Sequence, residues 1–488
     1  MTHQPFTRLK HQQLLKTQSY INGRWLGSKD TFDVIDPATG DCLVQVCNLD
    51  VSAAQQAIAA AHNAWPAWRV LTGRERSQLL RQWFDLICLH SDDLALLMTV
   101  EQGKPLAEAK GEVVYGASFV EWYAEEAKRI YGETLTTPDP RKRLSVIKQP
   151  VGVCAAITPW NFPLAMITRK VAPALAAGCT VVVKPAEQTP LTALALAELA
   201  HQAGLPPGVF NVLAADGQRS IEIGQALCAS PVVRHLSFTG STEVGRILAA
   251  QCAPTIKKLS LELGGNAPFI VFDDADLEDA VQGALISKYR NSGQTCVCAN
   301  RFYVQEGIHD AFVNRFTAAV HALKVGSGLD EGTQVGPLID EQALQKVQKH
   351  VKDALDKGAQ VMCGAHVMQG QYYAPTVLTG ATSDMLCAHE EIFGPVAPIF
   401  KFCDESEVLS LANHTDMGLA AYFYSQNIAR TVRVSEALEY GMVGINTGLL
   451  TTAEAPFGGM KQSGLGREGG WQGLEEYLEL KYLCLGGL

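Results

Sequence analysis

Short apolar runs alternate with longer amphipathic stretches between about residues 150 and 262. The expected helices cover 163–177 and 191–203, and each is followed by a glycine, Gly178 or Gly204, which favours a helix end. This alternation predicts β-α-β units on a parallel sheet, a nucleotide-binding architecture with ligands at the carboxyl ends of its strands. The expected strands cover residues 153–157, 180–184, 209–213, 235–238 and 257–261.

A second α/β pattern begins with an apolar strand at 268–272, followed by an acidic helix start at 273–276 whose carboxylates suit a helix N-terminus. It continues with a helix at 341–357 and strands at 418–425 and 442–446. Helices at 51–65 and 73–99 are expected to pack on the first unit. The last segment, 474–484, alternates imperfectly and predicts an exposed edge strand, which invites pairing with another chain. No internal repeat or linker is apparent.

The composition limits the number of packed units and the kinds of binding partner. A chain of 488 residues implies two or three packed units. A hydrophobic content of 47% with 18% charged residues indicates a well-packed protein with much interior. The formal net charge of -10 and the absence of a polybasic run argue against a nucleic-acid partner.

Three features indicate a cytoplasmic protein without a membrane partner. The 13 cysteines are odd in number and lack disulfide-framework spacing, which fits a reducing compartment. The first ten residues contain no apolar signal-peptide region. The uncharged run 149–168 is long enough to span a membrane, but Pro150, Pro159 and Pro163 interrupt it, so it predicts strand, turn and helix start.

Two segments carry candidate chemistry. Residues 291–301 hold a thiol, Cys296, in a Gly-containing turn, and residues 261–266 hold a carboxylate, Glu262, beside two glycines. A thiolate is a nucleophile, and a carboxylate of raised pKa activates water. Alone, either residue has a structural alternative: Cys296 as an inert buried thiol, and Glu262 as a strand cap or a partner of Lys257 or Lys258.

Two strand-to-helix turns offer hydrogen-bond donors. In the first, 159–163, the Asn161 amide is suited to hold an oxyanion, although an Asn here also suits a helix N-cap. In the second, Gly240, Ser241 and Gly245 follow a strand and open a helix, which suits a pyrophosphate. The second turn lacks a full G-x-G-x-x-G pattern, so by itself it is weak evidence for a dinucleotide.

These segments, in this order and spacing, resemble the aldehyde dehydrogenase superfamily, and the resemblance extends from Tyr20 almost to the last residue. Within the superfamily the chain is most similar to succinate-semialdehyde dehydrogenases. The resemblance implies oxidation of an aldehyde by NAD(P). Cys296 forms a thiohemiacetal and then a thioester, Asn161 and the Cys296 N–H hold the oxyanion, and Glu262 activates the hydrolytic water. No metal is expected.

The resemblance also implies an α/β fold with three parts. A Rossmann-type cofactor domain comprises residues 1–128 and 148–260, and an α/β catalytic domain comprises residues 261–470. A small oligomerisation arm comprises residues 129–147 and 471–488. The implied assembly is a homotetramer, built as a dimer of dimers.

NAD is the implied cofactor, with NADP less favoured. The Lys184 position binds the adenosine ribose in the family, and Glu187 accepts hydrogen bonds from a free 2′-hydroxyl but repels a 2′-phosphate. NADP-preferring bacterial relatives tend to carry a small residue there. Glu391 is expected to hold the nicotinamide ribose and Phe393 to pack near the ring, although Phe393 also suits the core. The implied cofactor positions are Trp160, Lys184, Glu187, Gly240, Ser241, Gly245, Leu263, Glu391 and Phe393.

For a semialdehyde, the carboxylate end is expected to meet Arg169 and Arg290, with Thr451 at a position where relatives carry Ser. Each Arg has a structural alternative as a salt-bridge partner at the domain junction. Glutarate semialdehyde, or a broader range of aldehydes, remains an alternative substrate, because one methylene alters binding by only ~1–3 kcal/mol. Cys298 lies two residues after Cys296, where a reversible disulfide or simple packing is expected.

Two other functions fit these residues less well. A CoA-acylating aldehyde dehydrogenase typically lacks the base at Glu262, so the presence of Glu262 disfavours that reaction. A non-catalytic protein that keeps the fold is disfavoured because Cys296, Glu262, Asn161 and Lys184 occur together.

Overall fold

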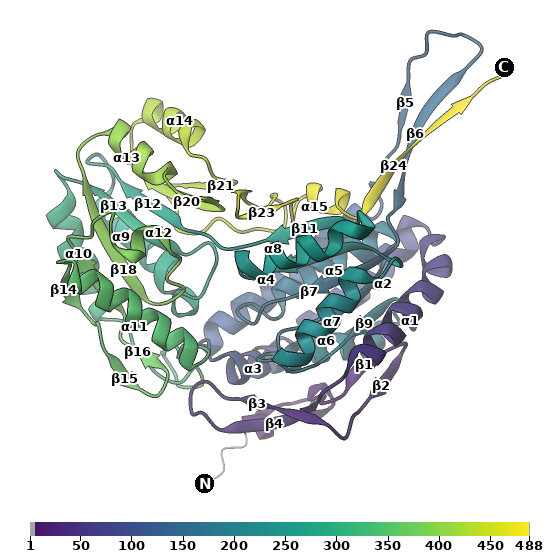
Figure 1. Ribbon diagram of the computed structural model, residues 1–488, viewed down its shortest axis with the longest axis horizontal. Helices are drawn as coiled ribbons and strands as arrows, with labels where there is room; N and C mark the ends of the chain where they lie inside the picture. Colours follow the sequence, from purple (N-terminus) through teal and green to yellow (C-terminus); the bar gives the residue numbers. More distant parts are fainter. Residues whose placement is uncertain (1–4, 488) are drawn as a thin grey trace.

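The computed structural model describes residues 5–487 and has two lobes with a projecting arm (Figure 1). The first lobe is built on an eight-stranded sheet in the order β2-β1-β9-β8-β7-β10-β11-β23. Its parallel centre brings the predicted strands together, and β1 and β23 extend it on either side as antiparallel neighbours. The strands are β1 (Ser19–Ile21), β2 (Arg24–Leu26), β7 (Val153–Ile157), β8 (Thr180–Lys184), β9 (Phe210–Val212), β10 (Val233–Thr239), β11 (Lys258–Glu262) and β23 (Gly464–Leu465).

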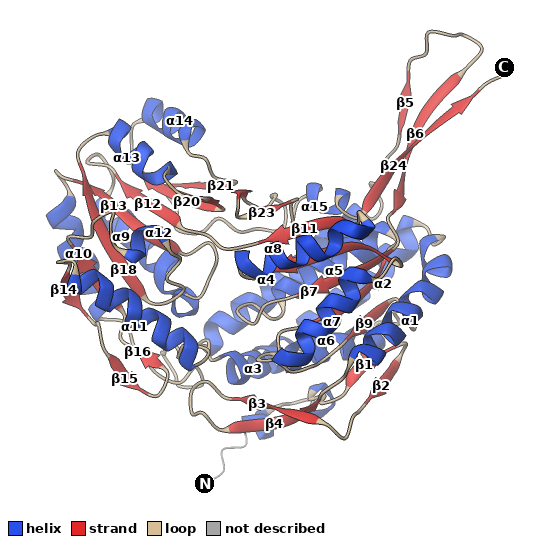
Figure 2. Cartoon of the chain, in the orientation of Figure 1, coloured by secondary structure: helices blue, strands red, loops and turns tan. Residues whose placement is uncertain are grey.

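Helices surround this sheet (Figure 2). They are α1 (Val51–Arg69), α2 (Gly73–Leu89), α3 (Ser91–Gln102), α4 (Leu106–Glu126), α5 (Ala165–Ala177), α6 (Pro190–Gln202), α7 (Gly217–Ala229) and α8 (Thr242–Cys252). The single helix expected over 73–99 was wrong, because His90 leaves helical geometry at φ -100° and ψ 19°. Two aspartates then occupy the first turn of α3, where a helix dipole favours negative charge.

The second lobe contains a seven-stranded sheet, ordered β14-β17-β18-β13-β12-β20-β21. The strand expected over 418–425 is divided: β19 (Met417–Gly418) pairs with β22 (Met460–Lys461), and only β20 joins the large sheet. The sheet strands are β12 (Ala267–Val271), β13 (Ala299–Gln305), β14 (Gln360–Cys363), β17 (Thr376–Thr379), β18 (Val396–Phe402), β20 (Ala420–Tyr424) and β21 (Met442–Ile445). The helices include α9 (Leu277–Tyr289), α10 (His309–His321), α11 (Glu341–Asp356), α13 (Glu405–Asn413) and α14 (Ile428–Ala437).

The arm is a three-stranded antiparallel sheet that projects from the first lobe (Figure 1). It comprises β5 (Glu133–Leu135), β6 (Arg143–Pro150) and β24 (Leu478–Leu485), with β24 at one edge. Leu480, Tyr482 and Leu485 on this edge strand are more than half exposed. Pairing of this edge with another chain stays a prediction.

Helix α5 is buried along its whole length, including Arg169 and Lys170. Charged side chains in such a place require charged or hydrogen-bonding partners. The chain supplies them from its far end, where β23 returns from the second lobe and pairs with β11. Among the described residues, no helix is both long and apolar enough to cross a membrane.

Candidate active site

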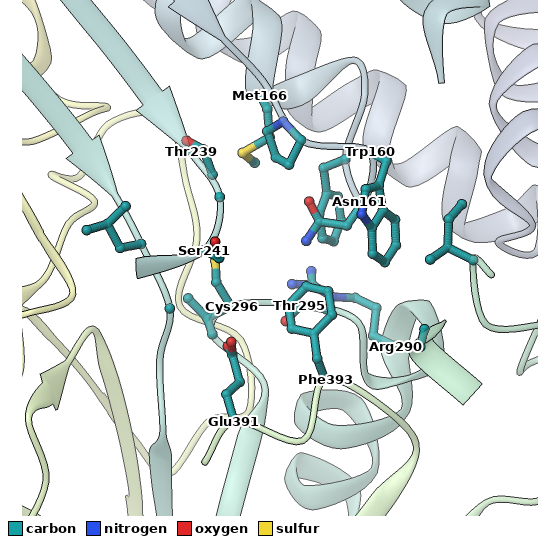
Figure 3. A pocket seen from close by; sticks show the side chains of 18 of the residues that line it. Trp160, Asn161, Met166, Thr239, Ser241, Arg290, Thr295, Cys296, Glu391 and Phe393 are labelled. Carbon is teal, nitrogen blue, oxygen red and sulfur yellow. The ribbon is translucent and has the colours of Figure 1, made fainter. Parts of the chain in front are cut away.

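A cavity of about 550 Å³ contains the proposed nucleophile (Figure 3). The loops that follow β7 and β10 form one wall, as expected for the carboxyl ends of parallel strands. Glu262, Lys184, Glu187, Gly245 and Cys298 do not line it. The predicted site residues that do line it are Trp160, Asn161, Arg169, Gly240, Ser241, Leu263, Arg290, Cys296, Glu391, Phe393 and Thr451.

The loop that carries Cys296 has an unusual and tightly held backbone. Asn291 and Ser292 both have left-handed conformations, with φ of 51° and 56°. The Gln294 side chain accepts a hydrogen bond from the Ile339 N–H at 2.9 Å and so fixes the turn to the second lobe. Gly265 packs on the loop: a Cβ there would lie 2.3 Å from the Cys296 carbonyl oxygen. The backbone of the nucleophile is therefore positioned before any substrate binds.

The Cys296 thiol is neutral at rest. Its enclosure by protein raises its pKa to about 12, against the opposing effect of the Arg169 guanidinium. The carboxyl groups of Glu391 and Glu262 act in the same direction as burial. A nucleophilic role for Cys296 would therefore require its thiol to lose a proton before it attacks a substrate.

Asn161 points its amide into the cavity close to Cys296 (Figure 3). Its Nδ2 donates to the Gln294 carbonyl at 3.0 Å, which leaves the second amide hydrogen free for an oxyanion. Its own backbone carbonyl accepts from Lys104 Nζ at 2.7 Å and from Asn291 Nδ2 at 3.0 Å. The side chain of Asn161 therefore does not cap α5.

The cap of α5 comes instead from a buried ion pair on other elements. Glu112 accepts hydrogen bonds from the N–H groups of Leu164 at 3.0 Å and Ala165 at 3.2 Å, and it pairs with Lys104 at 2.5 Å. Lys104 and Glu112 thus orient the Asn161 turn. The sequence offers no motif for this pair, because both look like ordinary charges next to and within an amphipathic helix.

Glu262 lies at the end of β11 and is 2% exposed. Its side chain does not pair with Lys257 or Lys258, which bind backbone carbonyls elsewhere. Its Oε2 has no hydrogen-bond partner among the described residues. Burial raises the pKa of Glu262 well above its usual value, and the nearby Glu468 carboxylate adds to the rise. The raised pKa extends the pH range in which Glu262 is protonated, and only its ionised form can take a proton from water.

Glu468 is the main charged residue that sequence reasoning missed. It is 4% exposed and forms ion pairs with both Arg169 and Lys170. Burial alone would raise the pKa of Glu468, but the two cations hold it below its usual value. Arg169 therefore forms the salt bridge that was expected as its structural alternative. It also lines the cavity, and its Nη2 lacks a hydrogen-bond partner among the described residues.

Arg290 differs from Arg169 in having no carboxylate in contact. Its guanidinium makes no hydrogen bond or ion pair with any residue from 5 to 487, and it lies 5.5 Å from the Phe162 ring centroid. Thr451 and Tyr115, the latter not foreseen, line the same cavity. The cavity therefore holds a guanidinium without a direct carboxylate contact, although Glu108 lies within electrostatic reach of it, and two hydroxyl groups, which suit an anionic ligand.

The remaining predicted positions fit a dinucleotide. Ser241 caps α8, whose N-terminus opens at the cavity, and a Cβ at Gly245 would lie 2.5 Å from Leu263. Beside β8, Lys184 Nζ lies 3.5 Å from Glu187 Oε2. These groups offer a helix dipole for phosphates and a cation next to a carboxylate for a ribose.

Glu391 and Phe393 line the cavity from the second lobe. Glu391 Oε1 accepts the Gly265 N–H at 3.2 Å, and burial raises the pKa of Glu391 to about 7. The Phe393 ring meets Trp160 edge to face, with 5.7 Å between ring centroids, so Phe393 forms the cavity wall as well as part of the packing.

Cys298 is buried and turned away from the cavity. Its thiol donates to the Lys288 carbonyl at 3.4 Å, with the Ala299 carbonyl at 3.5 Å. A disulfide with Cys296 would require the thiol to leave these acceptors and the loop to rearrange. The redox role of Cys298 stays a prediction.

Comparison with known proteins agrees with this geometry. A glutarate-semialdehyde dehydrogenase of Pseudomonas putida is 59% identical over 480 residues, covering 98% of this chain and 99% of that protein. The NADP-linked succinate-semialdehyde dehydrogenase of Escherichia coli is 58% identical over 483 residues, covering 98% and 100%.

Among solved structures, an aldehyde dehydrogenase from Brucella melitensis biovar abortus superposes with a TM-score of 0.97 at 59% identity, covering 98% of this chain and 99% of that one. The model of the aldehyde dehydrogenase family matches residues 25–483. The resemblance and the α/β fold that it implied are confirmed, and the chain belongs to the aldehyde dehydrogenase family.

Proposed function

We propose that the enzyme oxidises succinate semialdehyde to succinate and prefers NAD to NADP. One observation carries the choice of substrate: the unpaired Arg290 guanidinium lines the cavity that holds Cys296. A semialdehyde has a carboxylate for this cation at one end and a carbonyl for the thiol at the other. The names of the bacterial relatives, succinate-semialdehyde and glutarate-semialdehyde dehydrogenase, support a substrate of this class.

In the first half of the reaction, Cys296 loses its proton and its sulfur bonds to the aldehyde carbon. The carbonyl π electrons move to oxygen, where Asn161 Nδ2 and the Cys296 N–H stabilise the negative charge. Loss of one such donor typically costs about 3 kcal/mol of transition-state stabilisation. A bound NAD would supply the acceptor for the hydride on this carbon, so that the carbon held by Cys296 would become a thioester.

In the second half, a water adds to the thioester carbonyl while Glu262 takes its proton. The carbon–sulfur bond then breaks, which releases the carboxylic acid and restores Cys296. The lack of a hydrogen-bond partner for Glu262 Oε2 supports this role, because the carboxylate has room to accept a proton. A Cβ at Gly458 would lie 2.9 Å from Glu262 Oε1, so a glycine there keeps that side of the base clear.

Arg290→Ala should raise KM for succinate semialdehyde by about 10- to 150-fold, because a hydrogen bond to a charged group contributes about 1.5–3 kcal/mol. The kcat/KM for butanal, which has no carboxylate, should change much less. Steady-state kinetics on both aldehydes measures the difference. Arg169→Ala is a less clean test, because it leaves Glu468 buried beside Lys170 alone.

Arg315→Ala is the matched control, since Arg315 is a surface residue of α10 paired with Glu278. This variant should have the wild-type KM and kcat/KM for both aldehydes. Parallel losses on succinate semialdehyde and butanal in Arg290→Ala would show that Arg290 supports the loop of the nucleophile rather than the substrate carboxylate. The kcat/KM values for four- and five-carbon semialdehydes decide between succinate and glutarate semialdehyde. A higher value for the latter would overturn the preferred substrate.

The preference for NAD rests on Glu187, which lies beside Lys184 at the end of β8. Its carboxylate would repel a 2′-phosphate but can accept a hydrogen bond from a 2′-hydroxyl. Glu187→Ser should narrow the ratio of kcat/KM for NAD over NADP by roughly tenfold, equivalent to about 1.4 kcal/mol. Glu222→Ser on α7 removes a charge of the same sign from an exposed position and should leave the ratio unchanged. A wild-type enzyme that favours NADP would refute the preference.

We also propose that the enzyme is a cytoplasmic homotetramer. The apolar edge strand β24 supports the assembly, because an exposed edge with unpaired backbone groups is a template for another strand.

A further inference from the structure

Three side chains outside the cavity meet where the N-terminal segment crosses the start of α3. One nitrogen from each imidazole of His11 and His90 and one carboxylate oxygen of Asp93 lie within 4.8 Å of one another. The two rings stand edge to face, with 4.4 Å between their centroids. None of the three lines the active-site cavity, and α3 lies on the side of the first lobe away from the arm (Figure 1).

His90 is 6% exposed, and its buried Nδ1 has no hydrogen-bond partner among residues 5–487. A buried polar atom without a partner typically costs about 1–3 kcal/mol. An imidazole can offer a lone pair to a metal ion from whichever ring nitrogen carries no proton. A neutral imidazole nitrogen without a hydrogen-bond partner is available to bind a metal ion.

Asp93 is already oriented toward the two rings. It is 2% exposed and accepts from the Lys10 N–H at 2.8 Å, from the His11 N–H at 3.1 Å and from His11 Nδ1 at 2.8 Å. A carboxylate offers about four lone-pair sites, so capacity for one more contact remains. The nearby lysines do not oppose a cation with their full charge, because Asp92 pairs with Lys10 at 2.8 Å and with Lys110 at 2.9 Å.

We propose that His11, His90 and Asp93 bind one divalent first-row transition-metal ion, such as Zn²⁺ or Co²⁺. Two imidazoles and one carboxylate are a donor set for these borderline ions rather than for Ca²⁺ or Mg²⁺. Ligand atoms of a tetrahedral zinc site lie roughly 3.4 Å apart, given bonds of about 2.0–2.1 Å. The widest pair of ligand atoms, within 4.8 Å, therefore has to close by up to about 1.4 Å, whereas His11 Nδ1 and Asp93 Oδ2, 2.8 Å apart, have to separate slightly. The His11 side chain, 43% exposed, can make that movement, and water can occupy the remaining position.

The role of such an ion would be structural. It would tie the segment that includes Gln12–Leu14 to the first turn of α3, far from the reacting atoms. If His11 coordinates the ion through Nδ1, the proton that this nitrogen donates to Asp93 has to move to its Nε2. This site could not be predicted from the sequence, because His11 and His90 are far apart along the chain and no ligand spacing links them.

The test is a Co²⁺ titration of the tag-free full chain, followed by visible absorption and by thermal unfolding. We expect one Co²⁺ per chain, d–d bands without sulfur-to-metal charge transfer, and a Tm that rises with Co²⁺ concentration. His11→Asn should weaken binding by at least about tenfold, the usual scale for loss of a metal-site group. Activity of this variant in metal-free buffer should match that of the wild type.

His62→Asn is the matched control, because His62 is an exposed histidine of α1 outside the cluster, and it should bind Co²⁺ like the wild type. Equal binding by wild type and His11→Asn would overturn the proposal. So would a thiolate charge-transfer band, which would place the ion on a cysteine, or no binding at millimolar Co²⁺. If His11→Asn unfolds by circular dichroism, His11→Gln replaces it and is judged by the same criteria.

Discussion

Cys296→Ala should lower kcat for aldehyde oxidation by at least about a thousandfold, because removal of a covalent nucleophile leaves only binding and oxyanion stabilisation. NAD binding should be nearly unchanged, since Lys184 and Glu187, the groups proposed for the adenosine half, lie outside the cavity that holds Cys296. NADH release at saturating substrate measures kcat, and quenching of protein fluorescence by NAD measures NAD binding.

Cys298→Ala is the matched control for this variant. It removes a thiol two positions away that donates to the Lys288 carbonyl instead of facing the cavity, so turnover should be retained. Substantial activity in Cys296→Ala would mean that another group attacks the aldehyde. A joint loss of NAD binding would mean that the substitution disturbs the turn that Gly265 packs against.

Glu262→Gln should separate the two halves of the reaction. One rapid turnover of NADH per active site is expected, followed by a steady state slower by about a hundredfold or more, because general-base assistance typically contributes 10²–10⁴. In the wild type, deacylation should accelerate as pH rises through the raised pKa of Glu262, since only the ionised carboxylate takes a proton from water. The variant should lose this pH dependence.

Stopped-flow measurement of NADH across the pH range tests both statements. Glu278→Gln, at an exposed position of α9, is the control and should show the wild-type profile. A variant without the initial burst would show that Glu262 acts before the thioester forms, for instance on the thiol of Cys296.

The parallel strands of the first lobe could be predicted because each is a short apolar run bounded by glycine or proline. The division at His90 could not, because residues on both sides favour helix and only the local backbone geometry breaks it. The prediction of one continuous strand over 418–425 was wrong for a similar reason. Its residues all suit a strand, but Met417–Gly418 pairs with Met460–Lys461, and this pairing depends on a distant segment.

In the site, the residues within local motifs could be named from the sequence. Cys296 and Asn161 lie in the same cavity, as the resemblance implied. The buried charges that support them could not be foreseen. Lys104, Glu112 and Glu468 resemble ordinary surface charges until the fold brings them to Asn161 and Arg169. Such roles depend on partners from separate elements, which a local pattern does not contain.

The pairing of Glu262 with Gly464 across β11 and β23 places the proposed base next to a strand that the ribosome makes much later than β11. Glu468, which holds Arg169 and Lys170, follows a few residues later. A nascent chain would therefore expose the Cys296 loop on the ribosome long before the partners of its active site emerge. A chain that ended before Gly464 would therefore contain the Cys296 thiol but lack both the strand beside Glu262 and the Glu468 carboxylate that pairs with Arg169.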